Sequence, residues 1–275
     1  MKKNLAIGVF DSGMGGLTVL RALRRELPAE SFIYLGDTAR LPYGTKSRDT
    51  VKSYAMQMAQ LLIQRQIKAL VIACNTATTA ALEHLQTTFA SIPVIGVVRP
   101  GAAAAVAATR NQRIAVLATE TTIATHAYHD LIRQQLPNVV IHSRACSVLV
   151  ALAEEGMIDN AIAREALTHY LSGLTTEDTI LLGCTHFPVF KASLRKMLPE
   201  DVQLVDSADA TAAVLKEQLA TAALTYPNTK ERGSIQYLVT DSVQRFQTIG
   251  EFFLQEPIHK SDIELVNAGG ASTVT

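Results

Sequence analysis

A short apolar run that leads into a cysteine occurs twice in this chain. Residues 69–73 (ALVIA) precede Cys74, and residues 179–183 (TILLG) precede Cys184. Continuous apolar runs of this length predict strands that are buried on both faces of a parallel sheet, and a segment that can form a helix follows each one. Ligands of open α/β sheets bind at the carboxyl ends of the strands, so both thiols are expected where chemistry takes place.

This matching context separates the two cysteines from the third one. A cysteine on its own is often only a small buried apolar residue, and Cys146 lacks the strand-end context, so we interpret Cys146 as a packing or loop residue. Three cysteines without a CxxC pair make a poor disulfide framework, which indicates a reducing, cytoplasmic compartment.

The whole chain alternates strands with helices. Strands are predicted over residues 5–10, 32–36, 69–73, 93–98, 113–118, 139–142, 179–183, 203–205 and 234–240. Helices are predicted over residues 17–27, 48–66, 78–89, 102–108, 125–136, 149–155, 159–171, 189–198, 206–223 and 243–253. A break is expected at Pro100–Gly101, and the run 114–117 then repeats the run 7–10 at nearly the separation of the two cysteine units. We therefore predict an α/β fold of two similar doubly wound, mainly parallel-sheet domains that face each other, with the active site at their interface.

Composition narrows the class of protein. The 275 residues are 48% hydrophobic and 18% charged, which describes a compact folded chain. Basic and acidic residues balance at 25 each, which argues against a nucleic-acid surface. The N-terminus begins like a signal peptide, but Asp11 interrupts its apolar run, and no run approaches the ~18 apolar residues of a membrane span. We expect neither a nucleic-acid nor a membrane partner.

A glycine-rich turn, Asp11-Ser-Gly-Met-Gly-Gly16, links the first predicted strand to its helix. Backbone N–H groups in such a turn can face an anion. The glycines at 13, 15 and 16 lack the GxGxxG spacing of dinucleotide sites, so a small carboxylate fits the turn better than a nucleotide phosphate does.

Three chemistries fit two such thiols. A thiol hydrolase would pair one cysteine with His186 as its base, but it leaves the matching cysteine unexplained. A metal site would use Cys74, Cys184 and His186 without any of the usual ligand spacings. A racemase would place one thiol and one thiolate on opposite faces of a carbon, with Asp11 and His186 setting their protonation. The duplicated plan favours the racemase, and we expect neither a metal nor an organic cofactor.

Four motifs together resemble those of the glutamate racemase family, within the cofactor-independent aspartate/glutamate racemase superfamily. They are Asp11-Ser-Gly-Met-Gly-Gly16, Asp37 with Pro42-Tyr43-Gly44, Cys74-Asn-Thr76, and Cys184-Thr-His186-Phe-Pro188. The resemblance implies a two-cysteine interconversion of L- and D-glutamate that feeds peptidoglycan synthesis. It also implies one domain of residues 1–98 and 208–267 and a second of residues 99–207. We expect a disordered tail over residues 268–275, and a homodimer.

The resemblance assigns roles residue by residue. Cys74 would serve the D-enantiomer with support from Asp11. Cys184 would serve the L-enantiomer with support from His186. The residues that would hold the substrate are Ser12, Tyr43, Gly44, Asn75, Thr76 and Thr185, and the further acidic residues near the site would be Asp37 and Glu154.

Two other classes of function stay open. A decarboxylase or hydrolase would need only one of the two cysteines, and a two-lobed binding protein would hold a small ligand without turnover. Aspartate racemases share the fold and the thiols, but they tend to carry Glu where this chain has His186. The chain departs from the family pattern at Arg99, where an acidic residue is common, and at Ala151, where proline is common.

Overall fold

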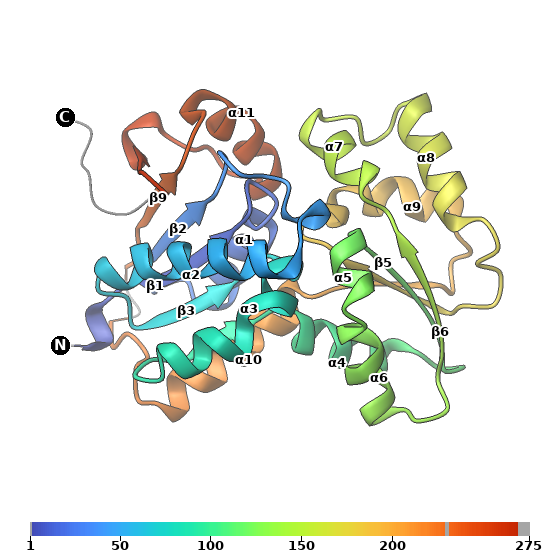
Figure 1. Ribbon diagram of the computed structural model, residues 1–275, viewed down its shortest axis with the longest axis horizontal. Helices are drawn as coiled ribbons and strands as arrows, with labels where there is room; N and C mark the ends of the chain where they lie inside the picture. Colours follow the sequence, from blue (N-terminus) through green and yellow to red (C-terminus); the bar gives the residue numbers. More distant parts are fainter. Residues whose placement is uncertain (1, 229–230, 269–275) are drawn as a thin grey trace.

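The computed structural model describes residues 2–228 and 231–268, and it shows two α/β domains side by side (Figure 1). Each domain is built on one sheet of parallel strands, in the order β10-β9-β2-β1-β3-β4 for the first and β6-β5-β7-β8 for the second. The first sheet consists of β1 (Ile7–Asp11), β2 (Phe32–Gly36), β3 (Ala69–Ile72), β4 (Val94–Gly96), β9 (Ile235–Val239) and β10 (Ile263–Leu265). The second consists of β5 (Arg113–Ala118), β6 (Val140–Ala145), β7 (Thr179–Gly183) and β8 (Gln203–Asp206).

The two sheets repeat one plan. The order β2-β1-β3-β4 in the first sheet matches β6-β5-β7-β8 in the second. Ile7 in β1 pairs with Ala69 in β3. The corresponding Ile114 in β5 pairs with Thr179 in β7. The strands that precede the two cysteines, β3 and β7, therefore hold the same inner position, and the predicted fold class of two similar parallel-sheet domains is confirmed.

Helices cover both faces of the sheets. They are α1 (Leu17–Glu26), α2 (Arg48–Gln64), α3 (Asn75–Thr88), α4 (Val98–Ala108), α5 (Glu120–Ala124), α6 (Ala127–Gln135), α7 (Val148–Glu154), α8 (Ala161–Leu171), α9 (Lys191–Met197), α10 (Ala208–Thr221) and α11 (Val243–Leu254). Short 3-10 helices are η1 (Lys2–Asn4), η2 (Tyr43–Thr45), η3 (Phe187–Phe190) and η4 (Lys260–Asp262). In the first domain, Phe10 and Ile72 belong to the core under α2 and α3, whereas Val9 and Val71 belong to the core under α1, α10 and α11. Successive strand residues thus bury their side chains on opposite faces.

Local sequence signals explain where several helices begin and end. The Ser47 hydroxyl accepts the Thr50 N–H at 3.3 Å and caps α2. The buried residues of α2 recur at helical spacing: Val51, Ala55, Met58, Ala59 and Leu62. Gly156 follows α7 with φ +68°, a left-handed conformation that favours glycine and stops the helix.

The structure corrects the sequence predictions around the first cysteine and beyond it. Helix α3 begins at Asn75, three residues before the predicted start, with Cys74 as its N-cap. The strand predicted over 93–98 is limited to Val94–Gly96, and Pro100–Gly101 is not a break, because α4 already begins at Val98. Proline is tolerated in the first turn of a helix, where its missing N–H has no intrahelical partner to lose. Strand β10 was not predicted.

The chain passes from the first sheet to the second between β4 and β5 and returns between β8 and β9. Helix α10 then packs against α1 of the first domain. The domain limits at 98/99 and 207/208 stay a prediction. Most of the tail predicted over 268–275 lies outside the described residues. Within residues 2–228 and 231–268, no helix combines the length and the apolar character that crossing a membrane requires.

Candidate active site

Cys74 lies at the carboxyl end of β3, in an inner position of the first sheet. Its sulfur accepts the backbone N–H of Ala77 at 3.4 Å, as the N-cap of α3. The thiol also faces the hydroxyl of Ser12, with 3.8 Å between sulfur and oxygen. Cys74 is 5% exposed, so it is nearly closed off from solvent.

Asp11 ends the neighbouring strand β1 and is completely buried. One carboxylate oxygen accepts the backbone N–H of Gly13 at 3.0 Å, and the other accepts the hydroxyl of Thr185, from the second domain, at 3.4 Å. Burial raises the pKa of Asp11, against the opposing charge of His186 and backbone hydrogen bonds. A raised pKa makes a carboxyl easier to protonate, so Asp11 is a candidate for exchanging a proton with a neighbouring group.

The surroundings of Cys74 keep it protonated. Burial, and next the negative charge of Asp11, raise the pKa of the Cys74 thiol to about 12. The hydrogen bonds that Cys74 makes with the Ala77 N–H and with the Ser12 hydroxyl lower the pKa but do not outweigh burial and Asp11. Cys74 therefore stands in this structure as a thiol that can give up a proton.

Cys184 follows β7 directly and stands at the start of a chain of three groups. Its sulfur lies 3.8 Å from Nδ1 of His186, and Nε2 of His186 lies 3.0 Å from Oε1 of Glu154 at the end of α7. Burial alone would lower the pKa of His186, but the hydrogen bonds and charges of Cys184 and Glu154 raise it to about 10. His186 is therefore an imidazolium at neutral pH, and it stabilises negative charge on the Cys184 sulfur.

The glycine-rich turn brings the two domains into close contact at this point. A Cβ atom on Gly15 would lie 2.4 Å from Nδ1 of His186 and 2.7 Å from the Thr185 hydroxyl oxygen. The turn can pass this close to His186 only because it has no side chain there. The hydroxyl of Thr18, one turn further on, donates to the backbone carbonyl of Thr185 at 3.0 Å.

The second predicted motif forms a compact polar group at the end of β2. Asp37 is buried, and its carboxylate accepts hydrogen bonds from the Tyr43 phenol, from Nε of Arg40 at 2.7 Å and from the Thr240 hydroxyl at 2.9 Å. The Tyr43 hydroxyl is thus directed to Asp37, and burial first and then Asp37 raise the pKa of Tyr43 far above its usual range. The carbonyl of Gly44 accepts the hydroxyl of Thr121 from the second domain at 2.9 Å.

Asn75 and Thr76, the first residues of α3, also reach the second domain. Oδ1 of Asn75 accepts the phenol of Tyr128 at 2.6 Å. Nδ2 of Asn75 is buried and has no hydrogen-bond partner among the described residues. The hydroxyl of Thr76 lies 2.9 Å from that of Thr119 and 3.2 Å from that of Thr122.

The structure therefore brings ten of the twelve predicted site residues together along the contact between the domains. They are Asp11, Ser12, Gly44, Cys74, Asn75, Thr76, Glu154, Cys184, Thr185 and His186. Asp37 and Tyr43 form their own buried group on the adjoining loop. The family departure at Ala151 leaves the contact between Glu154 and His186 intact.

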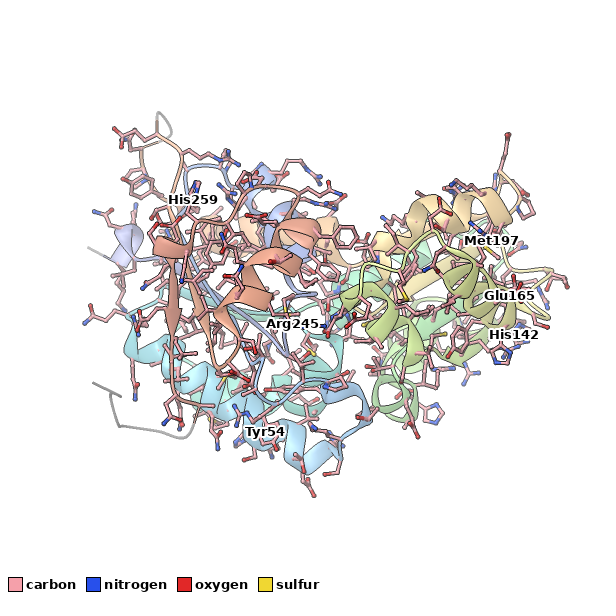
Figure 2. All side chains as sticks on the ribbon, turned by 90° about the horizontal axis from the view of Figure 1, so that it is seen from above. Tyr54, His142, Glu165, Met197, Arg245 and His259 are labelled. Carbon is pink, nitrogen blue, oxygen red and sulfur yellow. The ribbon has the colours of Figure 1, made fainter. Side chains whose placement is uncertain are left out.

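Some residues at this contact were not singled out from the sequence. Thr119 follows β5 as Ser12 follows the equivalent strand β1, so the internal repeat could have pointed to it. Tyr128 and Arg245 gave no such signal. Arg245 on α11 of the first domain pairs with Glu155 at 3.0 Å and with Glu154 at 3.9 Å, and Figure 2 shows it at the junction of the domains.

No group of three or more His, Cys, Asp and Glu side chains in the described part of the chain is arranged to hold a metal ion. Cys146 lies after β6, is fully buried in the hydrophobic core and donates to the carbonyl of Arg144 at 3.4 Å. It packs as predicted.

Comparison with known proteins gives the family. The model of the Asp/Glu/Hydantoin racemase family matches residues 7–215. A glutamate racemase of Geobacter metallireducens is 49% identical over 251 residues, which cover 90% of this chain and 92% of that protein. A glutamate racemase isoform of Bacillus anthracis has a similar structure, with a TM-score of 0.90 and 38% identity over 96% of this chain and 98% of that one. The structure of the glutamate racemase of Francisella tularensis, solved in complex with D-glutamate, is also similar. Its TM-score is 0.88, and it is 38% identical over 97% of this chain and 99% of that one.

The chain therefore belongs to the Asp/Glu/Hydantoin racemase family, and it is an isomerase of the racemase class. Within that family, the relatives named above are glutamate racemases.

Proposed function

We propose that this protein is a glutamate racemase that moves the proton at Cα between two cysteines. The observation that carries the proposal is the different surroundings of the two thiols. Cys74 lies near the buried carboxyl of Asp11, whereas Cys184 lies beside the imidazolium of His186. A two-base racemase needs one proton donor and one proton acceptor at a time, and these surroundings supply one of each.

The reaction from L- to D-glutamate begins at Cys184. Its thiolate, stabilised by His186, takes the α-proton, so that an S–H bond forms and the electron pair of the broken C–H bond stays on Cα. Cys74 then gives its thiol proton to the opposite face of Cα, which leaves a thiolate at Cys74. The reaction from D- to L-glutamate is the reverse: the Cys74 thiolate takes the α-proton, and the Cys184 thiol gives its proton to the other face. Repeated turnover from L to D requires Cys184 to release the proton that it gained and Cys74 to regain the one that it lost, and Asp11, near Cys74, takes part in this exchange.

We propose that the substrate is held mainly by neutral donors. The residues are Ser12, Gly44, Asn75, Thr76 and Thr185, whereas the phenol of Tyr43, also predicted to hold the substrate, donates to Asp37. The buried Nδ2 of Asn75, which lacks a partner among the described residues, supports a carboxylate acceptor beside it. Arg40, the one arginine in the four motifs, bonds Asp37 through Nε and Gln57 through Nη1, and its Nη2 is buried without a partner among the described residues.

Such a polar pocket discriminates by length. A ligand one methylene shorter leaves buried donors unpaired, at about 1–3 kcal/mol each, and two such donors give a preference of about a hundredfold or more. We expect kcat/KM for L-glutamate to exceed that for L-aspartate by at least about that factor. Polarimetric rates on both amino acids under one condition test the proposal, and comparable rates or a preference for aspartate would contradict it.

We also propose that the product supplies D-glutamate for peptidoglycan synthesis in the cytoplasm. This role is what the resemblance to the glutamate racemase family implies, and it does not rest on a feature of the site. The expected homodimer stays a prediction, which sedimentation of the purified protein tests.

A further inference from the structure

The side-chain amide of Asn75 is half satisfied. Oδ1 accepts a hydrogen bond at 2.6 Å, but Nδ2 is buried and has no partner in the described part of the chain. Asn75 is only 3% exposed. A buried donor without an acceptor is costly, so its place beside Cys74 indicates that a ligand supplies the acceptor.

The group that bonds Oδ1 is the phenol of Tyr128, which comes from α6 of the second domain. Tyr128 is 2% exposed, and burial, followed by the charges of Cys184 and Asp206, raises its pKa well above the usual value, so the phenol keeps its proton. Asn75 is its only hydrogen-bond partner among the described residues.

This pairing decides which way the amide of Asn75 faces. If the amide turned over, Nδ2 would face the phenol oxygen, and the O–H of Tyr128 would have no acceptor in a buried place. The observed orientation satisfies the phenol and leaves both protons of Nδ2 free for another group. The hydrogen bond therefore selects the orientation in which Asn75 is a donor to the site.

The ring of Tyr128 packs against two glycines, at places where a side chain would collide with it. A Cβ atom on Gly183, the residue before Cys184, would lie 2.9 Å from Cε2 of the ring. A Cβ atom on Gly101 in α4 would lie 3.1 Å from its hydroxyl oxygen. Tyr128 thus packs closely between the end of β7, next to Cys184, and helix α4, and this packing fixes its position.

We propose that Tyr128 is a positioning residue that holds the Asn75 amide with Nδ2 toward a carboxylate of the substrate. The proposal rests on the proposed function for the identity of the substrate. Tyr128 acts through Asn75, and because it belongs to the other domain, it makes this donor available only when the two domains are in contact.

The first test is Tyr128→Phe, which keeps the ring and removes the hydrogen bond. Loss of one hydrogen bond that orients a donor predicts a KM for glutamate about three- to tenfold higher, with kcat changed by less than about twofold. The rise should be similar for L- and D-glutamate, because the enantiomers have equal free energies and kcat/KM must stay equal in both directions. Tyr170→Phe, on α8, is the matched control and should leave both constants unchanged.

A double-mutant cycle separates positioning from a general effect on the fold. In an Asn75→Ala background, Tyr128→Phe should raise KM no further, because its effect passes through the amide that is absent. Additive increases in KM, or an unchanged KM in folded Tyr128→Phe, would overturn the proposal. If the unaltered protein does not racemise glutamate, the proposed function fails instead.

Asn75→Asp tests the same pair without altering Tyr128. The phenol can still donate to the new carboxylate, but the donor of Nδ2 is replaced by an acceptor. We expect KM to rise by at least tenfold while circular dichroism and the melting temperature stay near those of the unaltered protein. A normal KM in this variant would also overturn the proposal, whether or not Tyr128→Phe folds.

Discussion

Replacing Glu154 with glutamine tests how the charge behind His186 controls Cys184. The variant keeps the shape and a hydrogen-bond partner for Nε2, but it removes the negative charge 3.0 Å away. Both residues are buried, so water screens the pair little. A hydrogen bond to a charged group contributes about 1.5–3 kcal/mol, and 1.36 kcal/mol corresponds to one pKa unit. The pKa of His186 is therefore expected to fall by about one to two units from about 10.

The sign of the effect on rate follows from the proton on His186. An imidazolium stabilises negative charge on the neighbouring Cys184 sulfur, and a neutral imidazole does so less. At pH 7 His186 stays protonated in both proteins, because a pKa lowered by about one to two units from about 10 is still above 7. As the pH rises, the variant loses the imidazolium about one to two units earlier, so its loss in rate should grow from little at pH 7 to about five- to fiftyfold near pH 10.

The assay is kcat/KM for L-glutamate from about pH 6 to 10, in the unaltered protein and in Glu154→Gln. Glu155→Gln is the control, because Glu155 is exposed, contacts Arg245 and does not contact His186. We expect the control to stay within about twofold. A Glu154→Gln rate that is unchanged, or one that is reduced by the same factor at every pH, would refute the reasoning.

Two further predictions concern the cysteines and the contact between the domains. Cys74→Ala and Cys184→Ala should each lower racemisation by about 10²–10⁴-fold, since each removes a general acid–base group. Cys146→Ala is the control and should remain active. Near-normal rates in either Cys74→Ala or Cys184→Ala would argue against two bases. Arg245→Gln should slow turnover by no more than about fivefold, because Arg245 is half exposed, lies 3.9 Å from Glu154 and pairs more closely with the exposed Glu155, and exposed ion pairs contribute at most about 1 kcal/mol. A loss as large as that of Glu154→Gln would assign Arg245 a role beyond this ion pair.

The sequence predicts the fold well because its inner strands are continuous apolar runs. The runs before Cys74 and Cys184 became β3 and β7, in equivalent places of two sheets with the same strand order. Boundaries were harder to predict, since Cys74 itself caps α3 with its sulfur, a role that is more typical of Ser, Thr, Asp or Asn.

Contacts between the domains could not be read from the sequence. Tyr128 reaches Asn75 only because α6 of one domain meets α3 of the other, and no local pattern near residue 128 indicates that. Arg245 likewise lies on α11. The apolar periodicity of α11 predicts which face of the helix is buried, but it does not predict that Arg245 meets Glu155 at the end of α7. The repeat did contain an unused signal, because Thr119 takes the place in the second domain that Ser12 takes in the first.

The source of the new hydrogen at Cα tests the two-base proposal most directly. Purified protein is incubated with L-glutamate in D₂O, and both enantiomers are isolated early and analysed by mass spectrometry for deuterium at Cα. If Cys184 removes the proton and Cys74 delivers another from the opposite face, the first D-glutamate formed carries deuterium and the remaining L-glutamate does not. D-glutamate that retains the original hydrogen, or L-glutamate that gains deuterium as fast as D-glutamate appears, would contradict the two-cysteine mechanism.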